Sequence, residues 1–266
     1  MNIIVCIKQI LDPETPPAKF AIDRVRNKVI PPEGIPLVIN PYDAQAVELA
    51  LKLKEKNGGK ITVLSLDSKI NDSVIKHALS VGADEGFLII DAAFEGSDSF
   101  GIAHILTMAI RKIGNYDLIL FGRQAADWDE GIVGSIIAEN LNLPLITLAK
   151  SVELVGEELK VNRVIMLGSQ VFSTSIPAVV TVSNEAGQPR LPSGWGIISA
   201  ARKQVPVWHA QDIGADLTMV GSAVTRRKLT ELFIPERSRK CEMVTGTTIA
   251  EAAVKLAERL RETRAI

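Results

Sequence analysis

The sequence has little of what hydrolases and metalloenzymes use for their chemistry. Its 266 residues include two cysteines and three histidines, and the histidines form no HxxxH or HExxH pair. These features exclude a disulfide framework and the common zinc spacings. No Ser-His-Asp or Cys-His arrangement can be assembled, and the phosphate-binding motifs GxxxxGK[ST] and GxGxxG are missing. We therefore predict no catalytic residue and no metal site.

Long hydrophobic runs and a strong net charge are also missing. No apolar stretch reaches membrane-spanning length, and residues 2–8 are typical of a strand and not of a signal peptide. The formal net charge is −1, which argues against a nucleic-acid binder or a polybasic membrane anchor. We therefore expect a cytoplasmic protein with no direct membrane insertion and no nucleic-acid partner.

The chain does contain a regular alternation of apolar strands and amphipathic helices over its first 150 residues. We predict strands at 2–8, 60–66, 86–90, 116–121 and from 144, with helices at 41–57, 72–81, 102–113 and 131–141. Asn40 is expected to cap the first of these helices, with Pro41 at its first position. Near-continuous apolar strands with helical crossovers indicate an α/β fold, a doubly wound and mostly parallel sheet.

The remaining sequence follows a different pattern. Residues 151–163 indicate a β-hairpin around Gly156, and residues 178–182 indicate a further strand. From Val207 the chain lacks regular periodicity until an amphipathic helix begins at Thr248. A long segment with little core of its own is best explained as an arm that packs on another subunit. We expect an α/β nucleotide-binding domain at 1–206 and a C-terminal arm at 207–266.

The most informative stretch for function runs from Leu118 to Ser135. An apolar strand stops at Gly122, a polar loop follows, and a helix begins near Gly131. In open α/β sheets, ligands bind at the carboxyl ends of the strands where the strand order reverses, and helix N-termini suit phosphates. The ordinary alternative is a turn in which Asp127 or Asp129 caps the helix. Loops 6–9, 40–43 and 122–133 are expected to converge there, which favours an adenine nucleotide.

Several motifs of the chain resemble those of the β subunit of electron-transfer flavoproteins. They are Val5-Cys6-Ile7-Lys8-Gln9, Asn40-Pro41-Tyr42-Asp43, Gly82-Ala83-Asp84, Gly122-Arg123-Gln124-Ala125-Ala126-Asp127 and Pro177-Ala178-Val179-Val180-Thr181. The resemblance implies an electron carrier that works as a heterodimer with an α subunit, which carries one FAD. It also implies a dehydrogenase or other redox partner. A stand-alone adenine-nucleotide-binding protein is the rival hypothesis from another class.

The same resemblance bears on what the β cleft holds. In this family it holds either a structural AMP or a second FAD, and the FAD-holding members split electron pairs. Residues 40–43 and Gly96-Ser97-Asp98-Ser99 look like the FAD group, whereas Trp128 and Glu130 depart from it. The resemblance therefore implies FAD in the cleft and NADH-dependent electron bifurcation as a heterodimer, with AMP as the alternative.

The predicted cofactor-binding residues combine these loops with the end of the second strand and two serines placed toward the flavin ring. They are Cys6, Lys8, Asn40, Pro41, Tyr42, Asp43, Leu66, Ser97, Ser99, Gly122, Arg123, Gln124, Ala125, Ala126, Asp127, Trp128, Asp129, Glu130, Gly131, Ile132 and Val133. The loop that docks dehydrogenases in the family corresponds to residues 185–190 and has Ala186 at or near the usual leucine position. We expect this chain to exchange electrons poorly with acyl-CoA dehydrogenases.

Overall fold

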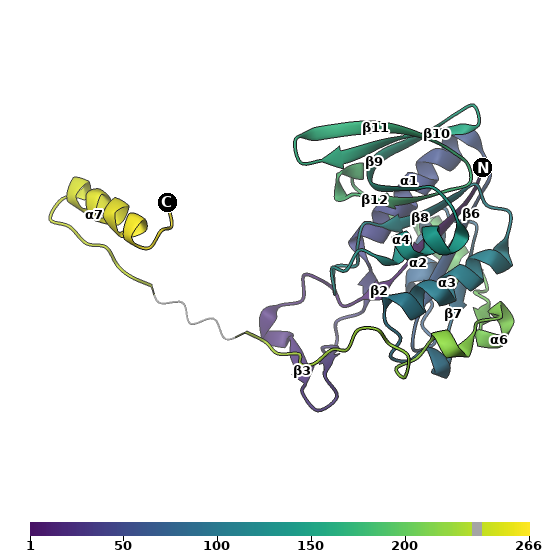
Figure 1. The fold of residues 1–266 in the computed structure, drawn as a ribbon, viewed down its shortest axis with the longest axis horizontal. Coiled ribbons are helices and arrows are strands. Elements are labelled where there is room, and N and C mark those ends of the chain that lie inside the picture. Colours follow the sequence, from purple (N-terminus) through teal and green to yellow (C-terminus); the bar gives the residue numbers. More distant parts are fainter. Residues whose placement is uncertain (236–240) are drawn as a thin grey trace. The chain divides into compact units, whose positions relative to one another are not determined.

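The computed structural model describes residues 1–235 and 241–266, which fall into two units, Met1–Thr230 and Glu231–Ile266. Within the described residues, a nine-stranded sheet has the order β11-β10-β9-β12-β8-β1-β6-β7-β13 (Figure 1). Its strands are β1 (Asn2–Ile7), β6 (Lys60–Leu66), β7 (Glu85–Ile89), β8 (Leu118–Gly122), β9 (Leu145–Val155), β10 (Glu158–Ile165), β11 (Gly168–Ser175), β12 (Ala178–Val182) and β13 (Val207–Trp208).

The helices α1 to α5 lie between these strands along the chain, and α6 and α7 follow the last strand. They are α1 (Pro41–Asn57), α2 (Ser73–Val81), α3 (Ser99–Ile113), α4 (Val133–Leu141), α5 (Gly194–Arg202), α6 (Ala210–Ile213) and α7 (Ile249–Glu262). Two small antiparallel pairs occupy the proline-rich excursion after β1: β2 (Gln9–Ile10) with β5 (Val38–Ile39), and β3 (Ala21–Asp23) with β4 (Lys28–Ile30).

The first strand lies in the middle of the sheet. β1 pairs in parallel with β6 on one side and with β8 on the other, whereas β9, β10 and β11 are antiparallel to one another. The chain builds outward from β1 through β6 and β7, then crosses back to place β8 on the opposite side of β1. The strand order therefore reverses between β1 and β8, and the predicted doubly wound α/β fold is confirmed.

Two apolar layers cover the two faces of the sheet. Alternate residues of β1 point to opposite sides, so that Val5 joins a core with α1, α2 and α5, and Ile4 joins a core with α3, α4 and α6. Each fully buried isoleucine or leucine in these layers contributes about 1.5–3 kcal/mol to the free energy of unfolding. This two-sided burial explains why the parallel strands are apolar along their length.

The antiparallel end of the sheet is larger than the sequence indicated. The predicted hairpin is present as β9 and β10, and β11 extends it as a third strand. β11 pairs with β10 and forms one edge of the sheet, and its residues are almost all exposed. Exposure on both faces removes the apolar alternation by which a strand is recognised from sequence, so this strand was missed.

The first unit ends later than the expected boundary at residue 206. Val207 and Trp208 form β13, which pairs with β7, and the Trp208 ring stacks on Phe87 at 4.1 Å between ring centroids. Residues of α6 and Val220 are buried in the core of the first unit. Residues 207–230, which we assigned to the arm, are therefore part of the first unit.

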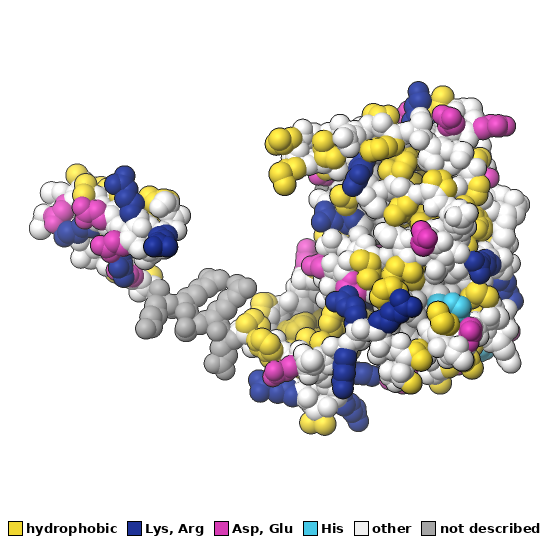
Figure 2. Space-filling view, in the orientation of Figure 1, with side chains coloured by type: hydrophobic (Ala, Val, Ile, Leu, Met, Phe, Trp, Pro, Cys, Tyr) yellow, Lys and Arg dark blue, Asp and Glu magenta, His cyan; other side chains and the backbone are white. Residues whose placement is uncertain are grey.

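The second unit consists of a short segment and α7, a helix whose hydrophobic and charged side chains are both on the surface (Figure 2). Ile249, Val254 and Leu256 are all exposed. Such a helix has no core of its own to stabilise it, so contact with a partner stays our prediction for residues 231–266. None of the helices in the described ranges is long and apolar enough to cross a bilayer.

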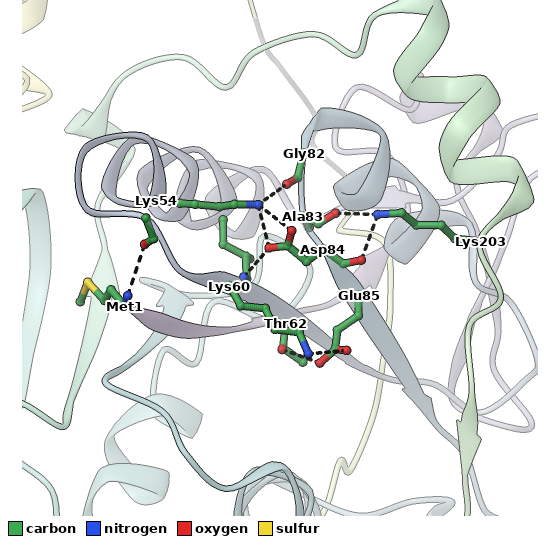
Figure 3. Close-up of polar contacts among 11 residues, drawn as sticks. Met1, Lys54, Lys60, Thr62, Gly82, Ala83, Asp84, Glu85 and Lys203 are labelled. Carbon is green, nitrogen blue, oxygen red and sulfur yellow. Dashed lines mark hydrogen bonds and ion pairs between the residues drawn. The ribbon is translucent and has the colours of Figure 1, made fainter.

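A polar brace around Asp84 holds the amino ends of β6 and β7 (Figure 3). The Asp84 carboxylate accepts hydrogen bonds from Lys54 Nζ at 2.7 Å and from the amide of Ile61 at 2.7 Å. Lys203, just after α5, donates to the backbone carbonyls of Ala83 and Asp84. One aspartate and two lysines thus tie α1, α5 and two strands together, at the end of the sheet opposite to the strand ends described below.

Candidate functional site

The candidate site lies where β1 and β8 end side by side. Asn40, which is only 1% exposed, does not cap α1 with its side chain as we expected. Instead its Nδ2 donates to the carbonyl of Gln124 at 2.8 Å, and its Oδ1 accepts from the amide of Ala126 at 3.1 Å. The asparagine therefore fixes the loop after β8 to the start of α1, a distance of more than eighty residues along the chain.

Asp43 joins the ends of the two strands. Its carboxylate accepts hydrogen bonds from the amide of Lys8 at 2.8 Å and from the amide of Gly122 at 3.0 Å. Burial raises the pKa of Asp43 to about 7, although both amides oppose that shift. A Cβ atom on Gly122 would lie 2.5 Å from Asp43 Oδ1, so only glycine permits this close approach.

Each charged residue of the loop has a polar partner. Lys8 Nζ lies 2.6 Å from Asp127, and Gln124 Nε2 donates to Asp129 at 2.6 Å. The Arg123 guanidinium lies over the Tyr42 ring and donates to Asn184 at 3.1 Å. Neither Asp127 nor Asp129 caps the following helix, so the capping alternative is wrong.

The N-terminus of α4 is accordingly open. Ile132 precedes it, and the side chain of Ile132 makes no capping hydrogen bond. The first backbone amides of a helix have no intrahelical acceptor and carry the positive end of the helix dipole. They follow directly after the loop that Asn40 holds, and the chain turns into the helix at Gly131, which has a left-handed φ of 64°. This arrangement suits a phosphate group.

The structure brings most of the predicted residues together. Residues Lys8, 40–43 and 122–133 meet at the ends of β1 and β8, and Leu66 ends the neighbouring β6. Cys6 is buried, and burial followed by the charge of Asp43 raises its pKa, so it is an unreactive thiol. Trp128 is 51% exposed on the loop.

Ser97 and Ser99 lie beside a segment that the sequence did not place in the site. The amide of Gly221 donates to Ser97 Oγ at 2.8 Å, and the Ser99 hydroxyl donates to Glu130. Glu130 also forms an ion pair with Arg227 at 2.7 Å. We call residues 221–227 the strap. In the sequence, the strap stood out only by its basic residues at 226–227. Such residues are usually exposed surface charges, so they did not indicate a site.

Asp98 anchors the strap to the start of α3. One carboxylate oxygen caps α3 by accepting from the amides of Phe100 and Gly101, and the other accepts from the amides of Arg226 and Arg227. Burial would raise the pKa of Asp98, but these hydrogen bonds outweigh it and hold the pKa below its ordinary value. The strap is therefore held through its backbone, which leaves the Arg227 side chain available for Glu130.

The predicted docking loop is held by ion pairs of Arg190, one with the buried Glu48 and one with the exposed Glu55. Arg190 donates through Nε to Glu48 at 2.8 Å and through Nη1 to Glu55 at 2.5 Å, both on α1. Ala186 is partly buried against the core. The exposed apolar side chains of this region are Leu191, at 90%, and Trp195, at 82%. The expectation of poor exchange with acyl-CoA dehydrogenases, which rested on Ala186, stays a prediction.

Known proteins resemble this chain along its whole length. The model of a family described as "Electron transfer flavoprotein domain" matches residues 28–213. The chain belongs to the electron transfer flavoprotein family. It is 38% identical over its whole length to the "Electron transfer flavoprotein subunit beta" of Thermoanaerobacterium thermosaccharolyticum, all of which is covered.

Two further relatives of the electron transfer flavoprotein family carry other names. The "Caffeyl-CoA reductase-Etf complex subunit CarD" of Acetobacterium woodii is 34% identical, over 98% of each chain. "Protein FixA" of Azorhizobium caulinodans is 34% identical, over 97% of this chain and 93% of that one. The resemblance indicated by the motifs is confirmed, and with it the prediction of electron transfer as the function.

Proposed function

We propose that this chain acts as the β subunit of a heterodimeric electron carrier and binds FAD at the β1–β8 switch point. The observation that carries the nucleotide site is the loop fixed by Asn40 next to the uncapped N-terminus of α4. It supplies backbone amides for a phosphate, with the apolar end of β6 at one side. These residues fit the adenylate part of FAD.

In this proposal the chain positions the cofactor and does no bond chemistry of its own. FAD supplies one- and two-electron transfer when bound. Asn40 and Asp43 hold the loop and the strand ends, and the α4 amides orient a phosphate. The exposed apolar positions of α7 favour an α subunit as the partner of residues 231–266, and the name "subunit beta" of the relatives supports such a partner. Cytoplasmic location and flavin-based bifurcation within the heterodimer belong to the same proposal.

A structural AMP in the same cleft is the second candidate. The observation that favours it is the ion pair between Glu130 and Arg227, which lies where the flavin half would extend toward Ser99. An adenylate at the α4 N-terminus leaves this pair intact, whereas a dinucleotide requires it to open. Trp128, on the same loop, is a second group that FAD would have to accommodate.

The deciding experiment identifies the ligands released when the purified heterodimer is denatured. We expect two FAD per heterodimer and substoichiometric AMP. One FAD with one AMP, together with a second flavin admitted only after Trp128→Gly, would establish AMP as the natural occupant. A colourless monomer that turns over ATP would refute the electron-carrier assignment as a whole.

A further inference from the structure

Glu130 holds a position that an anionic ligand group would also occupy. Its carboxylate accepts from the Ser99 hydroxyl at the start of α3 and pairs with the Arg227 guanidinium at 2.7 Å. Ser99 is buried, and the Glu130 side chain is 27% exposed. A hydroxyl and a guanidinium are also the donors with which proteins bind phosphate oxygens.

The backbone positions that carry the two donors do not depend on Glu130. Ser99 is the first residue of α3, and Asp98 caps that helix. Arg227 is placed by its backbone amide, which donates to Asp98 at 3.2 Å, and by the amide of Gly221 on Ser97. If the Glu130 side chain rotates away, the Ser99 hydroxyl stays at the start of α3 and the Arg227 backbone stays bound to Asp98, so both donors lose an acceptor while their points of attachment are kept.

Glu130 itself lies on a sharp turn of the candidate site. Its neighbours Asp129 and Gly131 both have left-handed φ values, 53° and 64°, and the open N-terminus of α4 begins three residues later at Val133. The carboxylate thus reaches from the loop of the adenylate site across to α3.

We propose that Glu130 is a built-in substitute anion that determines which nucleotide the cleft accepts. A mononucleotide binds at the α4 N-terminus and leaves the Glu130–Arg227 pair closed. The dinucleotide FAD displaces the Glu130 carboxylate and takes over Ser99 and Arg227 for its diphosphate or flavin carbonyl oxygens. This inference rests on the proposed nucleotide site and assigns specificity between two ligands of that site.

The test compares two variants that break the same ion pair. FAD and, separately, AMP are titrated into the full-length heterodimer after its exchangeable nucleotide has been removed, and binding is followed by calorimetry and flavin fluorescence. Glu130→Gln removes the competing charge and is expected to tighten binding of the second FAD about tenfold, the worth of a hydrogen bond to a charged group. Arg227→Gln leaves the Glu130 carboxylate without its cationic partner where FAD would bind, and it is expected to weaken FAD binding about tenfold.

Arg226→Gln is the matched control, because the Arg226 guanidinium lies over the Phe100 ring at 4.4 Å. It is expected to change the FAD affinity less than about twofold, and AMP is expected to bind all four proteins equally within about twofold. A purely structural ion pair would shift the two variants in the same direction, which would overturn the inference. A wild-type heterodimer that takes no second FAD would refute the proposed function, while uptake by Glu130→Gln would still uphold the inference. No second FAD in any protein would refute both.

Discussion

Replacement of Asn40 tests whether one buried side chain organises the candidate site. Asn40→Ala removes the bond to the Gln124 carbonyl and the bond to the Ala126 amide, and it leaves both partly buried backbone groups without the side chain that satisfies them. Each lost bond with its unsatisfied partner costs about 1–2 kcal/mol, so we expect the free energy of unfolding to fall by about 3 kcal/mol. Asn40→Asp keeps the acceptor for Ala126 but sets a carboxylate oxygen against the Gln124 carbonyl, and it is expected to cost at least as much.

The assay is urea unfolding at constant pH, combined with hydrogen exchange of residues 122–133. Both variants should show faster exchange in this loop and weaker AMP and FAD binding. Asn71→Ala is the control. The Asn71 side chain accepts an exposed hydrogen bond from the amide of Ser73, and we expect its removal to lower the free energy of unfolding by less than about 0.5 kcal/mol. If Asn40→Ala unfolds at the wild-type urea concentration and the exchange of the loop is unchanged, Asn40 does not hold the site together.

Three further predictions concern pH, the docking loop and the arm. Asp43 has a folded pKa of about 7 against an ordinary 3.8, so its contribution to stability is complete below about pH 4 and is lost as the pH rises to 7. In urea unfolding, the wild type should therefore be less stable at pH 8 than at pH 5, and Asp43→Asn should lack this difference. An equal change in the free energy of unfolding for both proteins would contradict the prediction. Arg190→Lys cannot reach Glu48 and Glu55 together and should cost about 1–2 kcal/mol, with faster proteolysis at residues 184–193. If the wild type and Arg190→Lys are cleaved at the same rate in this loop, Arg190 does not hold the loop in place. A chain cut after Thr230 should stay folded but lose its α subunit in co-purification, whereas a cut after Pro206 removes Trp208 from Phe87 and should give an aggregating protein. If the chain cut after Pro206 forms a stable heterodimer, both the role of the arm and the role of residues 207–230 in the fold are refuted.

The parallel part of the fold was predictable because burial on both faces leaves a strong local signal. Each of the strands β1, β6, β7 and β8 is an apolar run, and each intervening helix has its own periodicity. The switch point followed from the general behaviour of such sheets, and the three loops expected there, 6–9, 40–43 and 122–133, do contact one another.

The parts that were missed depend on contacts between distant residues. Asn40 has the sequence signature of a helix cap, and only the fold brings Gln124 and Ala126 within reach of its side chain. The strap has no periodicity, because hydrogen bonds from its backbone to Ser97 and Asp98 position it, and such bonds make no demand on its own side chains. Short-range patterns record neither kind of interaction.

The brace around Asp84 affects how relatives of this chain can be sorted. Gly82-Ala83-Asp84 was among the motifs that indicated the family, yet Asp84 ties together α1, β6 and β7 at the end of the sheet away from the candidate site. A search pattern built on it will retrieve chains that fold in this way, whatever nucleotide they carry. Subdividing the family by ligand requires positions such as 99, 130 and 227, which lie far apart in sequence and meet only in the folded protein.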